Sequence, residues 1–285
     1  MGYTYKDARL RYEGYNNQAF SDWSEEHAAY FYGFILGDGC LCSLRKSIVI
    51  GINTKDIDIL EKLKSYLGSR NKISTGIVQG KYSVSQFAFS DKEIVNRLIA
   101  NGLTSRKSTK ESIPDNLQYN RHFWRGLIDA DGSLVIKRNS KVFTISLVAS
   151  KETAEKFKLF CDTVVGSEAK IRLHSGSKNV YYCTVCGQKS RKIASLLYKD
   201  SQVYLDRKYQ LADSIKNDND YLNTKRSKAR PIPTRDGRWT MQVSVKRRTV
   251  RLGIFDTEEE AISARDAFIN NFNKENKLQE NSPNS

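Results

Sequence analysis

A nine-residue pattern that occurs twice constrains the fold more than any other feature. The two copies are Phe31-Tyr-Gly-Phe-Ile-Leu-Gly-Asp-Gly39 and Trp124-Arg-Gly-Leu-Ile-Asp-Ala-Asp-Gly132. Two glycines, an isoleucine and an aspartate recur 93 positions later, and in the segments that follow the offset drifts to 98. Loop insertions within a duplicated unit produce such a drift, so the sequence predicts two related halves of about one hundred residues each.

Each half has the pattern helix, two strands, helix, two strands, helix. In the first half we expect a helix from Ser24 to Gly39 and strands over 41–45, 47–52, 72–79 and 82–89, with Thr54 and Ser90 capping the later helices. The prediction is an α+β fold made of a duplicated αββαββα unit with a pseudo-two-fold axis, followed by a small domain of three strands and one helix. The expected segments are an N-terminal arm 1–23, repeats 24–108 and 109–215, a linker 216–227, the small domain 228–275, and a disordered tail 276–285.

Small residues recur four positions apart in both copies, and such spacing lets two helices approach closely. If the two copies pack on each other, Asp38 and Asp131 meet at the C-terminal ends of their helices. That arrangement is electrostatically poor, because the helix dipoles are negative there and the carboxylates repel each other. Divalent metal would compensate, and metal at such a centre can activate water for phosphodiester hydrolysis. A lone Asp-Gly would indicate a helix-end turn, but two copies in matching contexts favour the catalytic interpretation. The helix-packing residues are Gly33, Gly37, Gly126 and Ala130.

The chain is strongly basic, with 47 Lys and Arg against 32 Asp and Glu and a net charge of +15. This excess makes a polyanion the expected partner, and nucleic acid is the usual one. A hydrophobic content of 39% is enough for real cores and excludes a mainly disordered chain. There is no apolar run of the roughly 18–20 residues that a membrane span needs, and no secretory signal. We expect a soluble intracellular, cytoplasmic protein of phage, bacterial or organellar origin.

Five cysteines cannot all pair, and without a secretory signal they are expected to be reduced. Cys183-Thr-Val-Cys186 has the spacing of a zinc knuckle, but it lacks a second such pair and lies in a strand-like run. We therefore expect structural thiols rather than a zinc site. The five are Cys40, Cys42, Cys161, Cys183 and Cys186.

The paired motifs resemble those of the LAGLIDADG homing endonucleases in their single-chain form. Gly126-Leu-Ile-Asp-Ala-Asp-Gly132 matches the family name almost letter for letter, whereas the first copy has Leu36 and Gly37 in place of the Asp-Ala pair. The resemblance implies a saddle whose sheets lie in the DNA major groove, with cleavage of both strands to leave 3′ overhangs. It also implies Mg²⁺ or Mn²⁺ bound at the last acid of each copy and at the residue before it. These metal-site residues are Asp38, Asp131, Gly37 and Ala130.

The family resemblance further implies a lysine near the centre in each half. Lys107 and Lys208 are the best matches, although a surface lysine explains either equally well. In the strands, basic and aromatic residues are expected to contact guanine or phosphate, and solvation alone remains the alternative for each. The aromatic N-terminal arm either contacts DNA or packs on the saddle. The expected DNA-binding residues are Arg45, Lys46, Lys81, Tyr82, Lys137, Arg138, Lys141, Arg172 and Lys178.

Residues 228–255 contain eight basic residues and one acid, and they resemble the APETALA-type DNA-binding domain. The resemblance rests on Gly237-Arg-Trp239 at a strand start and on Leu252-Gly-Ile-Phe-Asp-Thr-Glu-Glu-Glu-Ala261 at a helix entry. It implies that the sheet contacts DNA, and a small basic domain with another role is the alternative. The implied contacts are Arg235, Arg238, Trp239, Gln242, Lys246, Arg248 and Arg251.

Together these features predict a monomeric, site-specific double-strand DNA endonuclease whose partner is its duplex target site. Two alternatives remain. One is a non-enzymatic DNA-binding regulator, against which both retained aspartates argue. The other is an intron-splicing cofactor that binds intron RNA, which only the context of the gene would identify.

Overall fold

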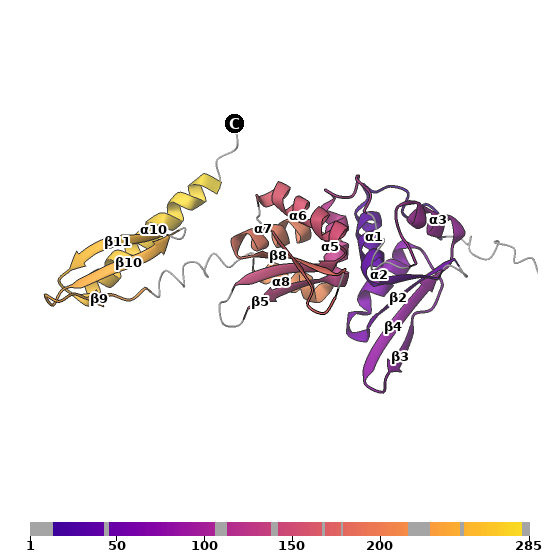
Figure 1. Ribbon diagram of the computed structural model, residues 1–285, viewed down its shortest axis with the longest axis horizontal. Coiled ribbons are helices and arrows are strands. Elements are labelled where there is room, and N and C mark those ends of the chain that lie inside the picture. Colours follow the sequence, from indigo (N-terminus) through magenta and orange to yellow (C-terminus); the bar gives the residue numbers. More distant parts are fainter. Residues whose placement is uncertain are drawn as a thin grey trace, which may run out of the picture. The chain divides into compact units, whose positions relative to one another are not determined.

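The structure is a computed structural model that describes residues 14–42, 46–105, 113–137, 142–166, 169–177, 179–215, 229–245 and 248–280. It divides into two compact units, one within residues 1–215 and one within residues 216–285 (Figure 1). We describe each unit by itself.

The first half of the larger unit has the predicted order of helices and strands. Its elements are α1 (Glu26–Asp38), β1 (Gly39–Cys42), β2 (Ser47–Asn53), the 3₁₀ turn η2 (Thr54–Asp56), α2 (Asp58–Tyr66), β3 (Ser74–Val78), β4 (Tyr82–Phe89) and α3 (Lys92–Ala100). The second half repeats this order and adds one helix. Its elements are α5 (Arg121–Asp131), β5 (Gly132–Ile136), β6 (Phe143–Ala149), α6 (Lys151–Val165), β7 (Lys170–Leu173), β8 (Tyr181–Cys186), α7 (Gln188–Tyr198) and α8 (Asp206–Ser214).

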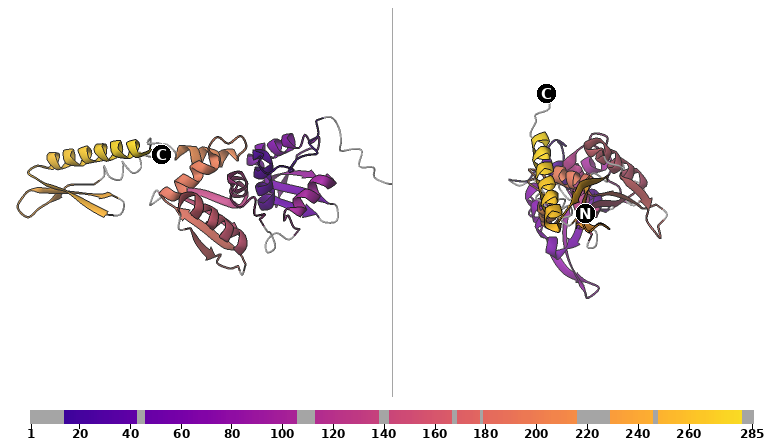
Figure 2. Two further views of the ribbon diagram at one scale, coloured as in Figure 1. Left: turned by 90° about the horizontal axis from the view of Figure 1, so that it is seen from above. Right: turned by 90° about the vertical axis from the view of Figure 1, so that its left-hand side faces the viewer.

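Each half contains one antiparallel four-stranded sheet. The first sheet has the strand order β1-β2-β4-β3 and the second has the equivalent order β5-β6-β8-β7. Strand residues alternate, so that Ile48 and Ile50 of β2 and Phe87 and Phe89 of β4 enter the core while their neighbours face away from it. The helix pair α1 and α5 lies between the two halves (Figures 1 and 2). The duplicated fold predicted from the sequence is therefore confirmed.

The capping residues expected in the first half differ from those in the structure, whereas Ser150, expected to open the corresponding helix of the second half, does cap α6. The helix expected from Ser24 begins at Glu26, because the Ser24 hydroxyl donates instead to Asp22 Oδ1 at 2.7 Å. Asp91 rather than Ser90 caps α3, and its Oδ1 accepts from the Ile94 amide at 2.9 Å. Thr54 opens the turn η2 instead of capping α2, and the cap of that turn is Asn53. Several oxygen-bearing residues are adjacent at each start, and the local pattern does not choose among them.

The described part of the predicted N-terminal arm packs on the first half. Phe20 is fully buried, and its ring meets Tyr66 of α2 edge-on with centroids 5.5 Å apart. The Asn16 amide donates to the Leu67 carbonyl at 3.0 Å. Residues 14–23 thus pack on this half and contribute Ala19 and Phe20 to its core, whereas residues 1–13 lie outside the described residues.

The smaller unit consists of β9 (Ile232–Pro233), β10 (Trp239–Val245), β11 (Arg248–Phe255) and α10 (Glu258–Glu280). The sheet is antiparallel in the order β11-β10-β9, and α10 packs on it. Thr257 and Glu260 form a capping box in which the Glu260 amide donates to Thr257 Oγ1 at 3.1 Å and the Thr257 amide donates to Glu260 Oε2 at 3.4 Å. The predicted three strands and helix are confirmed, and α10 includes residues 276–280 of the predicted tail. In the described residues we find no helix with the length and apolar character needed to cross a bilayer.

Candidate active site

The helices α1 and α5 touch backbone to backbone, and glycines make this possible. A Cβ placed on Gly126 would lie 1.9 Å from the Tyr30 carbonyl oxygen, and one on Gly33 would lie 2.2 Å from the Phe123 carbonyl oxygen. One on Gly37 would lie 2.4 Å from the Ala130 Cβ. No side chain fits at these three positions without moving a helix. The structure therefore places all four predicted helix-packing residues at or beside the contact.

This packing brings the two motif acids together. Asp38 and Asp131 are the last residues of α1 and α5, where the helix dipoles concentrate negative charge. The Asp131 carboxylate lies against the first motif, because its Oδ2 is 3.2 Å from the position that a Gly37 Cβ would occupy. Asp38 is half-buried and Asp131 is exposed, so the pair is open to solvent and to a ligand.

A cavity of about 280 Å³ opens beside Asp38 and receives residues from both halves. Asn53, Lys55 and Asp56 come from the end of β2 and from η2, whereas Asp129 and Arg207 come from the second half. The cavity thus combines carboxylates with two cationic side chains. Carboxylates suit a divalent cation, and cationic side chains suit a phosphate group bound beside that cation.

The donor set at this point fits a hard divalent cation. Two carboxylates converge where helix dipoles and mutual repulsion leave excess negative charge, which a cation offsets. Among the described residues no cluster of three or more His, Cys, Asp or Glu side chains could hold a metal. Asp38 and Asp131 would therefore supply only part of a coordination shell, and water and phosphate oxygens would supply the rest, as Mg²⁺ tolerates well.

Lys208 of α8 lies beneath the C-terminal end of α5. Its Nζ donates to three carbonyl oxygens, those of Ile128 at 2.6 Å, Asp129 at 2.8 Å and Gly132 at 2.8 Å. The side chain is only 4% exposed, and this burial lowers the pKa of Lys208 to about 8, although the charges of Asp129, Asp38 and Asp131 act in the opposite direction. Lys208 therefore caps α5 at the residues that flank Asp131. The other predicted lysine, Lys107, lies outside the described residues.

Asp129, the first acid of the second motif, is buried beneath the two open ones. Its Oδ2 accepts from the Tyr30 hydroxyl at 2.8 Å and from the Leu205 amide at 2.8 Å, and its Oδ1 accepts from the Tyr198 hydroxyl at 2.5 Å. Burial raises the pKa of Asp129, while the Lys208 charge and the three donors oppose that shift. This carboxylate therefore ties α1, α5, α7 and the start of α8 together, and its buried side chain forms part of the lining of the cavity beside Asp38.

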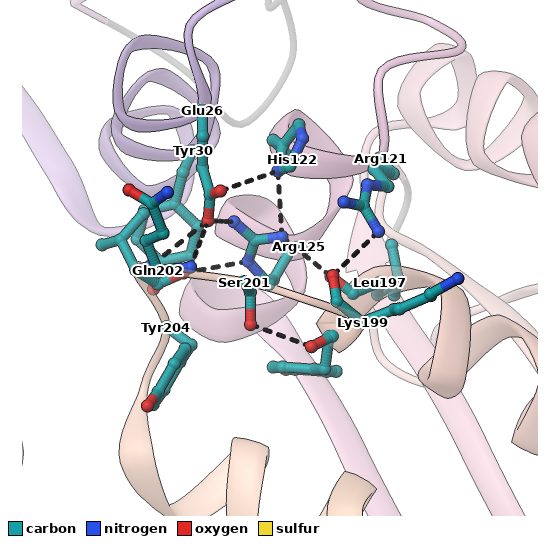
Figure 3. Close-up of polar contacts among 12 residues, drawn as sticks. Glu26, Tyr30, Arg121, His122, Arg125, Leu197, Lys199, Ser201, Gln202 and Tyr204 are labelled. Atoms are coloured by element: carbon teal, nitrogen blue, oxygen red, sulfur yellow. Dashed lines mark hydrogen bonds and ion pairs between the residues drawn. The ribbon is translucent and has the colours of Figure 1, made fainter.

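Arg125 of α5 forms a second buried polar cluster at the other end of the helix pair (Figure 3). Its Nη2 donates to Glu26 Oε1 of α1 at 2.6 Å, its Nη1 donates to the Leu197 carbonyl at 2.8 Å, and its Nε donates to the Val203 carbonyl at 3.0 Å. The His122 ring lies beside it, with Nδ1 3.1 Å from Arg125 Nη1. Burial and the Arg125 charge lower the pKa of His122 to about 4, so the ring is neutral and Nδ1 accepts.

Two further ion pairs join the halves next to the cavity. Arg207 Nε lies 3.1 Å from Asp56 Oδ1 and 3.2 Å from Oδ2. Lys62 of α2 lies 2.9 Å from Asp206 Oδ1 and 3.1 Å from Asp58 Oδ2, and it also donates to the Tyr204 carbonyl. Four consecutive residues at the start of α8 thus hold this region together. Leu205 contacts Asp129, Asp206 and Arg207 contact the first half, and Lys208 contacts the end of α5.

Arg125, Asp129 and Glu26 form buried contacts that the sequence did not predict. The sequence did contain a signal for buried polar contacts, because Arg125 and Asp129 carry opposite charges four residues apart inside an apolar run. The equivalent positions of the first motif, at the 93-residue offset, are Tyr32 and Leu36. A charge in an apolar helix requires a buried partner, but the pattern does not identify that partner.

The predicted DNA-binding residues lie at the edges of the sheets or on their open faces, as far as the structure describes them. Lys46 and Lys81 occupy turns, Lys137 follows β5, and Arg172 lies in β7, all with exposed side chains. Tyr82 is 51% exposed at the start of β4. In the smaller unit Arg235, Arg238, Gln242 and Arg251 are exposed, and Trp239 is half-buried. Outside the described residues, or with side chains outside them, are Arg45, Arg138, Lys141, Lys178, Lys246 and Arg248.

The cysteines are free thiols in two environments. Cys161 and Cys183 are buried in the second half, and burial raises the pKa of Cys183 to about 12. Cys40 and Cys186 are exposed, one on each sheet. The exposed thiols give each sheet a chemical reporter.

Comparisons with known proteins agree with this fold. Residues 118–194, within the second half, match the family described as LAGLIDADG-like domain. No curated protein sequence matches the chain significantly. The fold is the mixed α+β fold of LAGLIDADG homing endonuclease structures, with an additional three-stranded sheet and helix after it.

Several solved structures are similar to this chain. The I-LtrWI LAGLIDADG homing endonuclease bound to target DNA has a TM-score of 0.50 and 12% sequence identity, over 74% of this chain and 94% of that chain. The LAGLIDADG meganuclease I-AabMI bound to uncleaved DNA has a TM-score of 0.47 and 15% identity, over 69% and 91%. The N-terminal LAGLIDADG domain of WhiA has a TM-score of 0.42 and 17% identity, over 68% and 93%.

Proposed function

We propose that this protein is a site-specific DNA endonuclease that hydrolyses both strands of a duplex at the Asp38–Asp131 centre. The observation that carries the proposal is the backbone contact of α1 with α5, which places the Asp131 carboxylate against the first motif, next to Asp38 and the cavity that Asp38 lines with Lys55 and Arg207. The duplicated fold supports one such acid per DNA strand. The I-LtrWI structure named above is described as bound to target DNA, which fits the same use of the fold.

The chemistry follows from the residues at the centre. A bound Mg²⁺ or Mn²⁺ would lower the pKa of a coordinated water and stabilise charge on the leaving oxygen. Asp38 and Asp131 would hold it through hard carboxylate oxygens, with the adjacent Gly37 and Ala130 at the same place in the proposed site. Lys55 and Arg207 would neutralise a phosphate in the cavity. We further propose 3′ overhangs, intron homing and a monomeric enzyme, following the family resemblance.

Cleavage is tested with the full chain and a randomised duplex library, by recovering cut sites in the presence of Mg²⁺. Asp38→Asn and Asp131→Asn should abolish cutting while each variant still binds the recovered site in Ca²⁺. Asp115→Asn is the matched control, because its side chain is 92% exposed and lies away from α1 and α5. Wild-type cutting by either motif variant would exclude the proposed metal ligands. Binding without cutting by the wild-type chain would instead indicate the DNA-binding regulator, and selective binding of intron RNA would indicate the splicing cofactor.

We also propose that the smaller unit is an APETALA-type DNA-binding domain. Exposed Arg235, Arg238, Gln242 and Arg251 on or beside its strands support this, while Met241 and Val243 on β10 are buried. Tethering such a unit raises affinity through effective concentration. Deleting residues 225–285 should weaken DNA binding and flatten its dependence on salt, because fewer phosphate contacts release counterions. An unchanged salt slope would exclude this role.

A further inference from the structure

The open faces of the two sheets differ in chemistry, and this difference bears on the DNA sequence each would read. The inference rests on the proposed function, in which these faces contact DNA. On the first sheet, β2 and β4 bury Ile48, Ile50 and Phe87, so that Val49, Gly51, Gln86 and Ala88 take the opposite face. The second sheet alternates in the same way around buried Ile145.

Among the described residues, no strand of the first sheet contains a charged side chain. Its open face carries mostly small, apolar or amide side chains, with the exposed Tyr82 at the start of β4. Gln86 is the longest side chain at the centre of this face and is exposed. It has room because its neighbours in the register are Gly51 of β2 and Ser74 of β3. The Gln86 Nε2 is 3.5 Å from where a Gly51 Cβ would be, so the amide lies across the glycine.

A hollow of about 320 Å³ surrounds this amide. Val49, Ser74 and Ala88 form its floor, and Lys72 borders it before β3 begins. Other described basic residues near this sheet also lie outside its strands: Lys46 and Lys81 occupy turns, Lys55 lies in η2 after β2, and Arg70 precedes β3. Basic residues at strand ends and turns are placed for the phosphate backbone, and they do not supply a guanine contact from the centre of the face.

The second sheet carries basic side chains within a strand, which the described strands of the first sheet do not. Arg172 and Lys170 lie in β7, both exposed, and Arg172 is directly opposite Tyr182 of β8. The Tyr182 ring stacks on His174 with centroids 4.9 Å apart, which leaves an aromatic surface beside the guanidinium. Arg binds guanine O6 and N7 in a bidentate manner, whereas Gln binds adenine N6 and N7, and apolar side chains contact the thymine methyl group.

We propose that the target site is chemically asymmetric. The half-site that faces the first sheet is read as A·T pairs, by the Gln86 amide and by apolar contact of Val49 and Ala88 with thymine methyl groups. The half-site that faces the second sheet contains a guanine read by Arg172. Specificity for guanine thus resides in one half of the duplicated fold.

The test is selection of bound duplexes from a randomised library in Ca²⁺, with the full chain and with three variants. Gln86→Ala should relax A·T preference in one half-site, and Arg172→Ala should relax a G·C preference in the other, each by roughly 5- to 150-fold. Gln188→Ala, an exposed glutamine at the start of α7, is the matched control and should leave both half-sites unchanged. A strong guanine preference in the half-site that Gln86→Ala affects would overturn the proposal. A guanine preference that is lost in the Lys72→Ala variant would also overturn the proposal.

Chemical labelling of the exposed thiols distinguishes failure of this inference from failure of the proposed function. Cys40 pairs with Val49 in the register of the first sheet, and Cys186 pairs with Thr144 in that of the second. Both should be protected from N-ethylmaleimide when the chain is bound to a selected duplex, as measured by peptide mass spectrometry. If neither is protected, the sheets do not face DNA and the proposed interface is wrong. If both are protected but the half-sites show no difference in base preference, only the present inference is wrong.

Discussion

The Arg207 guanidinium of the second half binds the Asp56 carboxylate of the first, with Nε 3.1 and 3.2 Å from its two oxygens. Asp56 is 13% exposed at the side chain and Arg207 is 49% exposed, so the pair lies at the rim of the cavity beside Asp38. This contact joins the halves at the candidate active site and does not depend on the helix pair.

We expect Asp56→Asn to lower the free energy of unfolding by about 0.5–1 kcal/mol at low salt, the range for a half-exposed ion pair. The loss should shrink at high salt, because screening weakens the wild-type pair as well. Urea denaturation at two salt concentrations measures it. The exchanged pair, Asp56→Arg with Arg207→Asp, should recover most of the loss, and no recovery would show that the pair does not couple the halves.

Asp129→Asn should lower the free energy of unfolding much more than Asp56→Asn does. The carboxylate accepts from two hydroxyls and one amide while buried, and an amide group offers only one acceptor oxygen, so at least one donor loses its partner. We expect a loss of about 2–4 kcal/mol. The exposed control Asp115→Asn should stay within about 0.5 kcal/mol of wild type. Equal stabilities of the two variants by urea denaturation would contradict the buried network.

Gly126→Ala tests the helix contact. The added methyl group would lie 1.9 Å from a backbone oxygen, which cannot move aside as a flexible side chain can, so the helices must separate. We expect a loss of at least about 2 kcal/mol together with weakened Mn²⁺ binding by calorimetry, because both acids depend on the same contact. Gly76→Ala has no atom within 4 Å of the new methyl group and serves as the control. Unchanged stability of Gly126→Ala would disprove the close packing.

Protonation of His122 gives a pH dependence of stability. The pKa of this ring is about 4 in the folded chain and near 6.5 when it is unfolded, so between these values the unfolded state binds more protons. This contribution is therefore present above pH 6.5 and is lost as pH falls towards 4. We expect a difference of about 1–2 kcal/mol, reduced from the full shift by the partial exposure of the ring. His122→Gln should show a flatter profile from pH 7 to pH 4, and parallel profiles would argue against a buried neutral ring.

The Lys208→Met variant distinguishes a structural role of this lysine at the end of α5 from a role in proton transfer. If Lys208 holds the end of α5, cleavage should slow and Mn²⁺ should bind more weakly, while the shape of the pH–rate profile stays as in wild type. If Lys208 transfers a proton, the profile should lose a limb near pH 8, the pKa of the wild-type side chain. The three carbonyl contacts favour the first outcome. DNA binding in Ca²⁺ serves as the control and should change least.

The sequence was enough to predict the duplicated fold, because alternation in the strands and the recurring motif are local patterns. It also predicted that Asp38 and Asp131 would meet if the two motifs pack on each other, since small residues four apart allow a close helix contact. The partners of Arg125 and Lys208 could not be predicted. Glu26 lies 99 positions from Arg125, and the carbonyls bound by Lys208 lie 76 to 80 positions from it, so only the folded chain decides these contacts.

The difference between Tyr32 and Leu36 in one motif and Arg125 and Asp129 in the other makes the two halves unequal partners. Arg125 depends on Glu26 of the other half, and the position equivalent to Glu26 in the second half is Tyr119. A homodimer of residues 109–215 would bury two guanidiniums without the Glu26 carboxylate, at a cost of about 3–5 kcal/mol for each charge that loses its buried partner. The second half is therefore built to pair with the first half and not with a copy of itself.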